Sequence, residues 1–124
     1  MRILVCGSRD FSDREQLYRI MDEFIPAIEV VIEGEAPGAD TLAKEWAEER
    51  EIIIMPFPAN WKKYGRSAGP IRNRQMLDEG KPDMVVAFPS VYLHDTKGTK
   101  DMVKVARKRH IPTVVCGAGE LIRS

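Results

Sequence analysis

A glycine–threonine pair late in the chain, Gly98-Thr99, is the first feature that suggests chemistry. It follows an apolar run, Asp83–Pro89, typical of a strand that is buried on both faces, and it opens a segment with helical apolar spacing. The start of a helix presents free backbone N–H groups and the positive end of the helix dipole, so it attracts phosphate or carboxylate groups. An isolated pair of this kind more often marks an ordinary strand–loop–helix connection.

Three further loops carry residues of similar kinds, and each follows a short apolar run: Gly7-Ser8-Arg9, Gly34–Asp40 and Asn60–Asn73. In the first loop, Gly7 lets a ligand approach the backbone beside Ser8, although a plain turn explains the glycine nearly as well. The planar guanidinium of Arg9 suits a phosphate group, and a surface ion pair with a neighbouring aspartate is the alternative.

The second loop offers backbone donors. Gly34 and Gly38, with Ala39 beside them, flank a loop whose N–H groups are available to ribose or phosphate oxygens. Asp40 is predicted to cap the following helix first and to contact a ligand second. Later in the chain, Asn73 shares the buried helix face of Met76 and Leu77, so its amide needs partners. A ligand or a backbone carbonyl of a neighbouring loop can supply them.

The third loop is basic and aromatic. Pro56 and Pro58 predict an extended loop after the third strand. Between Asn60 and Leu77 there is no acidic residue, and the basic residues are Lys62, Lys63, Arg66, Arg72 and Arg74. Trp61 is equally suited to stack on a base and to pack in a small core, whereas Tyr64 favours a structural role. Binding of a single-stranded nucleic acid to this patch is one hypothesis, and it predicts affinity that falls steeply with salt.

Five apolar runs indicate strands: Arg2–Cys6, Glu29–Glu33, Ile52–Met55, Asp83–Pro89 and Thr113–Cys116. Amphipathic segments between them indicate helices, the first opened by a capping box at Ser12 and Glu15. This alternation predicts an α/β, Rossmann-like, doubly wound fold: a five-stranded parallel sheet of order 3-2-1-4-5 with helices on both faces. Residues 1–124 form a single domain in this prediction. Right-handed crossovers place all four loops at one edge of the sheet, which is where ligands bind in such folds.

Composition narrows the classes of partner. The 19 basic and 19 acidic residues cancel, so no global field recruits nucleic acid or a membrane, and we expect neither as a partner. No segment is long and apolar enough for a signal peptide or a membrane span, and we expect a cytoplasmic protein. We expect no metal site and no cofactor. Cys6 and Cys116 fall on strands separated by the fourth strand, too far apart for a disulfide.

The loop motifs occur in an order that resembles the SLOG superfamily of Rossmann-like nucleotide-binding proteins, and in particular its small bacterial and phage members related to YspA and YpsA. The matching pieces are Gly7-Ser8-Arg9-Asp10-Phe11, Gly34-x-x-x-Gly38-Ala39-Asp40, Asn60-Trp61-x-x-Tyr64-Gly65, Ala68-Gly69-Pro70-Ile71-Arg72-Asn73, and Ala87-Phe88-Pro89 with Gly98-Thr99. The resemblance implies a binder of a nucleotide-derived small molecule, such as a nucleoside phosphate, ADP-ribose or a cyclic relative, that acts as a sensor or carrier. Related proteins commonly pair, so a homo-oligomer is expected.

The combined prediction is a site at the carboxyl edge of the sheet. Its ligand-binding residues are Gly7, Ser8, Arg9, Gly34, Gly38, Ala39, Asp40, Trp61, Arg72, Asn73, Pro89, Gly98 and Thr99. The loop Ser90–Lys97 is a candidate lid. The alternative is an N-glycosidase: resemblance to the phosphoribohydrolase branch implies that Arg74 and Asp101 are its catalytic residues, with Arg74 holding the substrate phosphate and Asp101 orienting water or stabilising an oxocarbenium ion. This chain departs from that branch in the longer spacing between Pro89 and Gly98, and in having an aspartate where that branch has a glutamate.

Overall fold

The computed structural model describes residues 1–89, 97–116 and 121–123. Its strands are β1 (Arg2–Gly7), β2 (Val30–Glu33), β3 (Ile53–Pro56), β4 (Met84–Phe88), β5 (Thr113–Cys116) and β6 (Leu121–Arg123). Its helices are α1 (Arg14–Asp22), α2 (Ala39–Glu49), α3 (Trp61–Tyr64), α4 (Ala68–Gln75) and α5 (Lys97–Lys108), with a 3₁₀ turn η1 (Gly65–Ser67) before α4 and a π-helical turn η2 (Met76–Gly80) after it.

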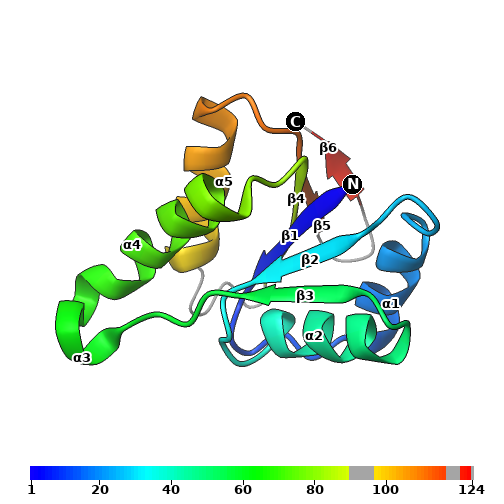
Figure 1. Ribbon diagram of the computed structural model, residues 1–124, viewed down its shortest axis with the longest axis horizontal. Helices are drawn as coiled ribbons and strands as arrows, with labels where there is room; N and C mark the ends of the chain where they lie inside the picture. Colours follow the sequence, from blue (N-terminus) through cyan, green and yellow to red (C-terminus); the bar gives the residue numbers. More distant parts are fainter. Residues whose placement is uncertain (90–96, 117–120, 124) are drawn as a thin grey trace.

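The strands form one sheet in the order β3-β2-β1-β4-β5-β6 (Figure 1). The first five are parallel, so the predicted Rossmann-like fold and the order 3-2-1-4-5 are confirmed. The sheet gains one strand that the sequence did not predict, because β6 pairs antiparallel with β5 where a short tail was expected. The central strand is β1, which pairs with β2 on one side and with β4 on the other.

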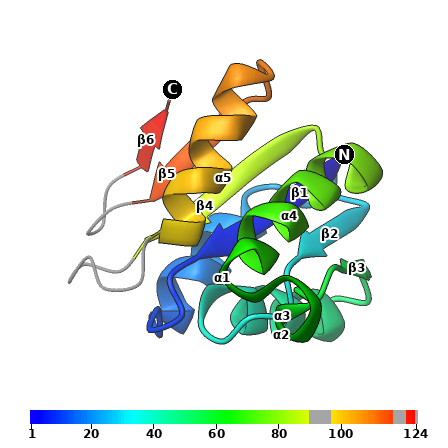
Figure 2. The same cartoon turned by 90° about the vertical axis from the view of Figure 1, so that its left-hand side faces the viewer.

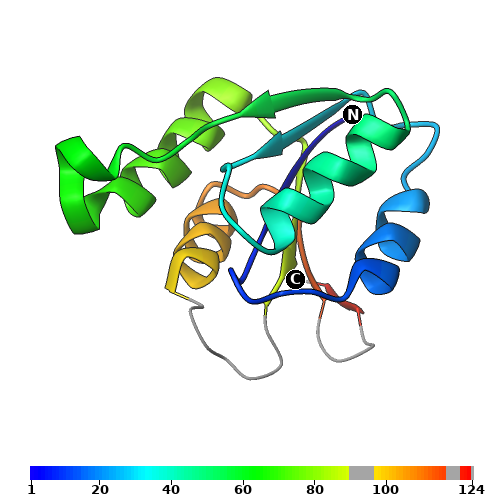
Figure 3. The ribbon, with the colours of Figure 1, turned by 90° about the horizontal axis from the view of Figure 1, so that it is seen from below.

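Two helical layers cover the sheet, as Figures 1 and 3 show: α1 and α2 on one face, α4 and α5 on the other. Alternation along β1 creates both cores, since Ile3 and Val5 pack towards α1 and α2 while Leu4 packs towards η2 and α5. Trp46 of α2 and Met102 of α5 are fully buried and anchor the two layers. Seen from the α4 and α5 side in Figure 2, both helices run along the sheet and converge towards the carboxyl end of β1.

The two predicted helix caps are wrong in detail. Helix α1 is capped by Asp13, whose carboxylate accepts from the N–H of Gln16, and not by a Ser12 capping box. Helix α2 is capped by Gly38, which has a positive φ of 80°, so Asp40 lies inside the first turn and cannot be the N-cap. A Cβ on Gly38 would also collide with the carbonyl oxygen of Ser8, which explains why glycine stands at this crossing of two loops.

The predicted extended loop after β3 is a short helix instead. The side chain of Asn60 accepts from the N–H of Lys63 and caps α3, a local hydrogen bond that favours helix over extended chain. Neither α3 nor η1 buries a side chain, and in Figure 1 they extend away from the sheet as an arm. Tyr64 is 41% exposed, so the structural role expected for it in a small core is wrong.

Cys6 and Cys116 are both buried and free, on strands that β4 separates, as predicted. Among the described residues, the helices are all too short or too polar to span a membrane.

Candidate functional site

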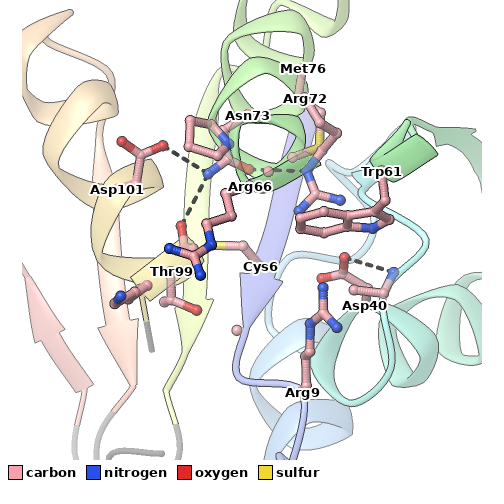
Figure 4. A pocket seen from close by; sticks show the side chains of 16 residues that line it. Cys6, Arg9, Asp40, Trp61, Arg66, Arg72, Asn73, Met76, Thr99 and Asp101 are labelled. Carbon is pink, nitrogen blue, oxygen red and sulfur yellow. Dashed lines mark hydrogen bonds between the residues drawn. The ribbon is translucent and has the colours of Figure 1, made fainter. Parts of the chain in front are cut away.

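A pocket of about 350 Å³ opens at the carboxyl end of β1, between α4 and α5 on one side and the loops around α2 and α3 on the other (Figure 4). Its lining residues are Cys6, Gly7, Arg9, Ala36, Asp40, Trp61, Arg66, Gly69, Pro70, Arg72, Asn73, Met76, Lys97, Gly98, Thr99 and Asp101. They come from every strand-to-helix loop that the sequence placed at this edge, except that residues 90–96 lie outside the described part of the chain.

The first turn of α5 forms one wall. The helix begins at Lys97, so Gly98 and Thr99 both lie in its first turn, where backbone N–H groups have no partner inside the helix. Thr99 is buried, yet its Oγ1 has no hydrogen-bond partner among the described residues. A buried hydroxyl without a partner costs free energy, and Thr99 is one of the residues that line the pocket, so this side chain is a candidate contact point for a ligand.

Asn73 ties α4 to this wall. Its Nδ2 donates to the carbonyl oxygen of Gly98 at 3.1 Å and to Oδ2 of Asp101 at 3.0 Å, while its Oδ1 accepts from Nε of Arg72 at 3.1 Å. Of the two partners predicted for this buried amide, the backbone carbonyl of a neighbouring loop is therefore present. The amide holds the first turn of α5 at a set distance from α4 and so shapes the pocket.

Gly34 connects two charged residues of the opposite wall. Its carbonyl oxygen accepts from Nη1 of Arg72 at 2.6 Å, and its N–H donates to Oδ2 of Asp40 at 3.0 Å. The same carboxylate oxygen also accepts from the N–H of Ala36 at 3.2 Å. A Cβ on Gly34 would collide with the Arg72 guanidinium and lie 3.0 Å from Oδ2 of Asp40, so no larger residue fits without moving them.

Burial shifts the pKa values of three residues that line the pocket. It raises the pKa of Asp40 to about 6, against the opposing effects of Arg72 and of the two backbone donors. Burial also lowers the pKa of Arg72 from its usual value, with Asp40 acting in the opposite direction. The pKa of the Cys6 thiol is raised well above its ordinary value, chiefly by burial, so the thiolate form of this pocket-lining residue is disfavoured.

The lining is biased towards positive charge. Its cationic side chains are Arg9, Arg66, Arg72 and Lys97, and its acidic ones are Asp40 and Asp101. In the view of Figure 4, Arg66 extends across the opening towards Thr99, while Arg9 and Arg72 approach the other half of the pocket. A concave site with excess positive charge favours an anion.

Trp61 supplies an aromatic wall. Its side chain is 48% exposed, and Cζ of Arg9 lies 5.2 Å from the ring centroid, within the range of a cation–π contact. The site therefore combines a flat apolar surface with cationic side chains and with the Thr99 hydroxyl, which has no partner among the described residues.

The two residues assigned to catalysis form an ion pair beside the pocket. Nη1 of Arg74 lies 3.0 Å from Oδ2 of Asp101 and Nη2 lies 3.3 Å from Oδ1, while Nη1 also donates to the carbonyl oxygen of Pro70. Asp101 lines the pocket, whereas Arg74 does not. Both carboxylate oxygens of Asp101 are thus occupied by protein donors.

Comparison with known proteins gives the context for this pocket. A family model described as the YspA, cpYpsA-related SLOG family matches residues 1–64, which is more than half of the 124 residues. The chain belongs to this SLOG family. It is also similar to the Gene 61 protein of Mycobacterium phage D29. The two are 32% identical over an alignment 124 residues long, which covers 94% of this chain and 96% of the phage protein.

The SLOG family match covers the half of the chain that supplies Gly7, Arg9, Asp40 and Trp61 to the pocket. The other predicted ligand-binding residues that line it come from the second half: Arg72, Asn73, Gly98 and Thr99. The pocket of this SLOG chain is thus completed by α4 and α5, outside the matched segment.

Five predicted ligand-binding residues do not line the SLOG pocket: Ser8, Gly34, Gly38, Ala39 and Pro89. The first four lie directly behind it. Ser8 is fully buried and its carbonyl oxygen accepts from Phe11, while Ala39 sits against the Cα of Gly7, where a Cβ would be 2.5 Å away. Pro89 lines a separate apolar groove along α5 with Val103 and Val115. The candidate lid at 90–96 lies outside the described residues.

Several lining residues of the SLOG pocket were not predicted: Cys6, Ala36, Arg66, Gly69, Pro70, Met76 and Lys97. Most are sequence neighbours of predicted residues, so a wider window around each motif would have found them. Arg66 is different, because its position depends on the 3₁₀ turn that follows α3. Its only sequence signal was membership of the basic run between Asn60 and Leu77.

Proposed function

We propose that this SLOG-family chain binds a nucleotide-derived small molecule in the pocket at the carboxyl edge of the sheet and acts as a sensor or carrier of it. The phosphate lies against the first turn of α5, at Gly98 and Thr99. The base stacks on Trp61.

The observation that carries the proposal is the buried hydroxyl of Thr99, which has no hydrogen-bond partner among the described residues, in a pocket with excess positive charge. A phosphate group at this position would accept hydrogen bonds from the hydroxyl and from N–H groups of the α5 first turn together. Arg66 and Lys97 line the same pocket, and their positive charges favour a phosphate group at the proposed position.

The other half of the pocket suits the rest of a nucleotide. The half-exposed indole of Trp61 offers a face to a base, and stacking on an aromatic ring contributes about 1–3 kcal/mol per base in nucleic-acid-binding proteins. A volume of about 350 Å³ falls within the usual range for small-molecule sites.

The first test is mass spectrometry of small molecules released from the protein purified from cells, followed by titration with AMP, ADP-ribose and cyclic AMP. Tryptophan fluorescence reports binding, because Trp46 is fully buried and Trp61 lines the pocket. We expect binding to change the fluorescence in the wild type and not in Trp61→Phe. A chain that releases no nucleotide and binds none of these compounds would contradict the proposal.

A pair of threonine variants separates function from folding. Thr99→Val should weaken binding by about tenfold or more, since hydrogen bonds to charged groups contribute about 1.5–3 kcal/mol. It should not lower the free energy of unfolding, because the hydroxyl has no protein partner to lose. Thr113→Val is the matched control: it removes a buried hydroxyl that donates to the Ile111 carbonyl oxygen, so stability should fall and binding should not change.

The same incubations test the enzymatic alternative. Chromatography of the AMP and ADP-ribose mixtures detects any free base. Release that stops in Asp101→Asn would assign N-glycosidic hydrolysis to the pocket, and binding without release supports the sensor or carrier.

A further inference from the structure

We infer that Asp40 selects the sugar of the ligand: its pocket-facing carboxylate oxygen accepts a hydrogen bond from a ribose hydroxyl, so the ligands are ribonucleotides and not deoxyribonucleotides. This inference rests on the proposed function.

The two oxygens of Asp40 have different surroundings. Oδ2 accepts from the N–H groups of Gly34 and Ala36 and so holds the loop before α2. Oδ1 makes no hydrogen bond with any described residue. Asp40 is only 5% exposed and it lines the pocket, so the surface it retains opens into the pocket. The structure therefore provides one free anionic acceptor inside the cavity.

Holding the loop does not require this charge. Gly38 already occupies the N-cap position of α2, and a neutral amide oxygen would accept from the same two N–H groups. A carboxylate that is buried costs free energy and also repels a phosphate ligand. Its presence is explained if the ligand brings a hydrogen-bond donor to Oδ1, because a hydrogen bond to a charged acceptor is about twice as strong as one between neutral groups.

Arg72 keeps that acceptor available. Its guanidinium lies near enough to favour the ionised form of Asp40, yet it donates to the Gly34 carbonyl and to Asn73, and it forms no ion pair with Asp40 within 4.0 Å. Gly34 thus lies between the two charged groups and hydrogen-bonds to both of them, so Oδ1 of Asp40 is not taken up by the guanidinium.

The position of Asp40 in the pocket points to the sugar. In Figure 4, Asp40 lies beside Trp61 and on the opposite side of the view from Thr99. With the base on Trp61 and the phosphate at Thr99, the group that bridges them is the ribose. Its hydroxyls are donors that are present in every ribonucleotide whatever the base.

The experiment is isothermal titration of the full chain with AMP and GMP and with their 2′-deoxy and 3′-deoxy forms. For the wild type we expect at least one deoxy form of each nucleotide to bind at least about tenfold more weakly than the ribose form. This is the expected effect of losing one hydrogen bond to a charged acceptor. Asp40→Asn keeps an oxygen for Gly34 and Ala36 and places an amide donor in the pocket, so the ratio of ribose to deoxyribose affinities should fall to about threefold or less.

Glu48→Gln is the control, since it removes one negative charge from an exposed position of the same helix, and its ratio should equal that of the wild type. Equal affinities of the wild type for the ribose and both deoxy forms would overturn the inference and leave the proposed function intact. So would an unchanged ratio in Asp40→Asn. If none of the nucleotides binds the wild type, the proposed function fails and this inference fails with it.

Discussion

Arg74 and Asp101 join α4 to α5 by a two-pronged ion pair, with N–O distances of 3.0 and 3.3 Å. The side chains are 44% and 24% exposed, so solvent screens their attraction. The neighbouring residue Asn73 makes the same connection from a buried position, with its Nδ2 on Gly98 and on Asp101. One wall of the pocket is therefore held by two contacts that differ mainly in their exposure to water.

This difference predicts unequal costs of mutation. Asn73→Ala should lower the free energy of unfolding by about 1–3 kcal/mol, because it leaves the Gly98 carbonyl and Nε of Arg72 without their partner. Arg74→Ala should cost less than about 1 kcal/mol, as exposed ion pairs do. Urea denaturation followed by circular dichroism measures both, with the exposed Gln75→Ala as the control on the same helix. A larger loss in Arg74→Ala than in Asn73→Ala would contradict this view of the wall.

Gly98→Ala is predicted to have opposite effects on stability and on binding. A Cβ at Gly98 meets no atom of the described chain within 4 Å, and alanine in a helix is more stable than glycine by about 0.5–1 kcal/mol. The unfolding midpoint in urea should therefore rise. Nucleotide affinity should fall at the same time, because the new methyl group lies beside the proposed phosphate position. A variant that is stabilised and binds as tightly as the wild type would place the phosphate elsewhere.

Glu33 should make the protein less stable at higher pH. It is fully buried at the end of β2, and burial first, then a hydrogen bond with Glu35, raise its pKa to about 8 from an ordinary value of 4.5. A raised pKa in the folded state means that the unfolded chain ionises first. The stability that Glu33 contributes is therefore complete below pH 4.5 and is lost as the pH rises towards 8.

The measurement is the free energy of unfolding of the wild type and of Glu33→Gln at several pH values. Gln cannot ionise, so the variant should gain on the order of 1–3 kcal/mol relative to the wild type between pH 5 and pH 8. Glu48→Gln, at an exposed position, should follow the wild type at every pH. Parallel curves for the wild type and Glu33→Gln would show that Glu33 is ionised in the folded chain.

The preference for ribose should depend on pH through Asp40. Its pKa of about 6 is the result of burial, opposed by Arg72 and increased by Glu35, while the Cys6 thiol is also close by. Only the ionised carboxylate is a strong acceptor, so the ratio of AMP to deoxy-AMP affinities should be larger at pH 7.5 than at pH 5. The phosphate titrates alike in both compounds and cancels from the ratio. A ratio that stays constant over this range would exclude a titrating acceptor.

The sheet was predictable from the sequence because its strands are nearly continuous apolar runs and because helices alternate with them. The pocket edge followed from that topology. The details that failed depend on single backbone torsions. Asp40 suits an N-cap by composition, but the positive φ of Gly38 starts α2 earlier and turns the carboxylate back onto Gly34 and Ala36.

The arm after β3 was harder to predict for a related reason. A local hydrogen bond from the N–H of Lys63 to the side chain of Asn60 decides between an extended chain and a short helix, and the prolines before it favour the extended form. The place of Arg66 in the pocket depends on that choice. The strand β6 has only three residues, too short for its period to be recognised.

The central position of β1 has a consequence for the way the chain acquires its shape during synthesis. Strand β1 is synthesised before β4 and takes it as its second partner only when β4 has been made, so the sheet stays half covered while the residues between the two strands are translated. Pairings this distant in sequence slow folding. A nascent chain that stops after α3 has no α4 or α5, and one side of its three strands would face chaperones and water.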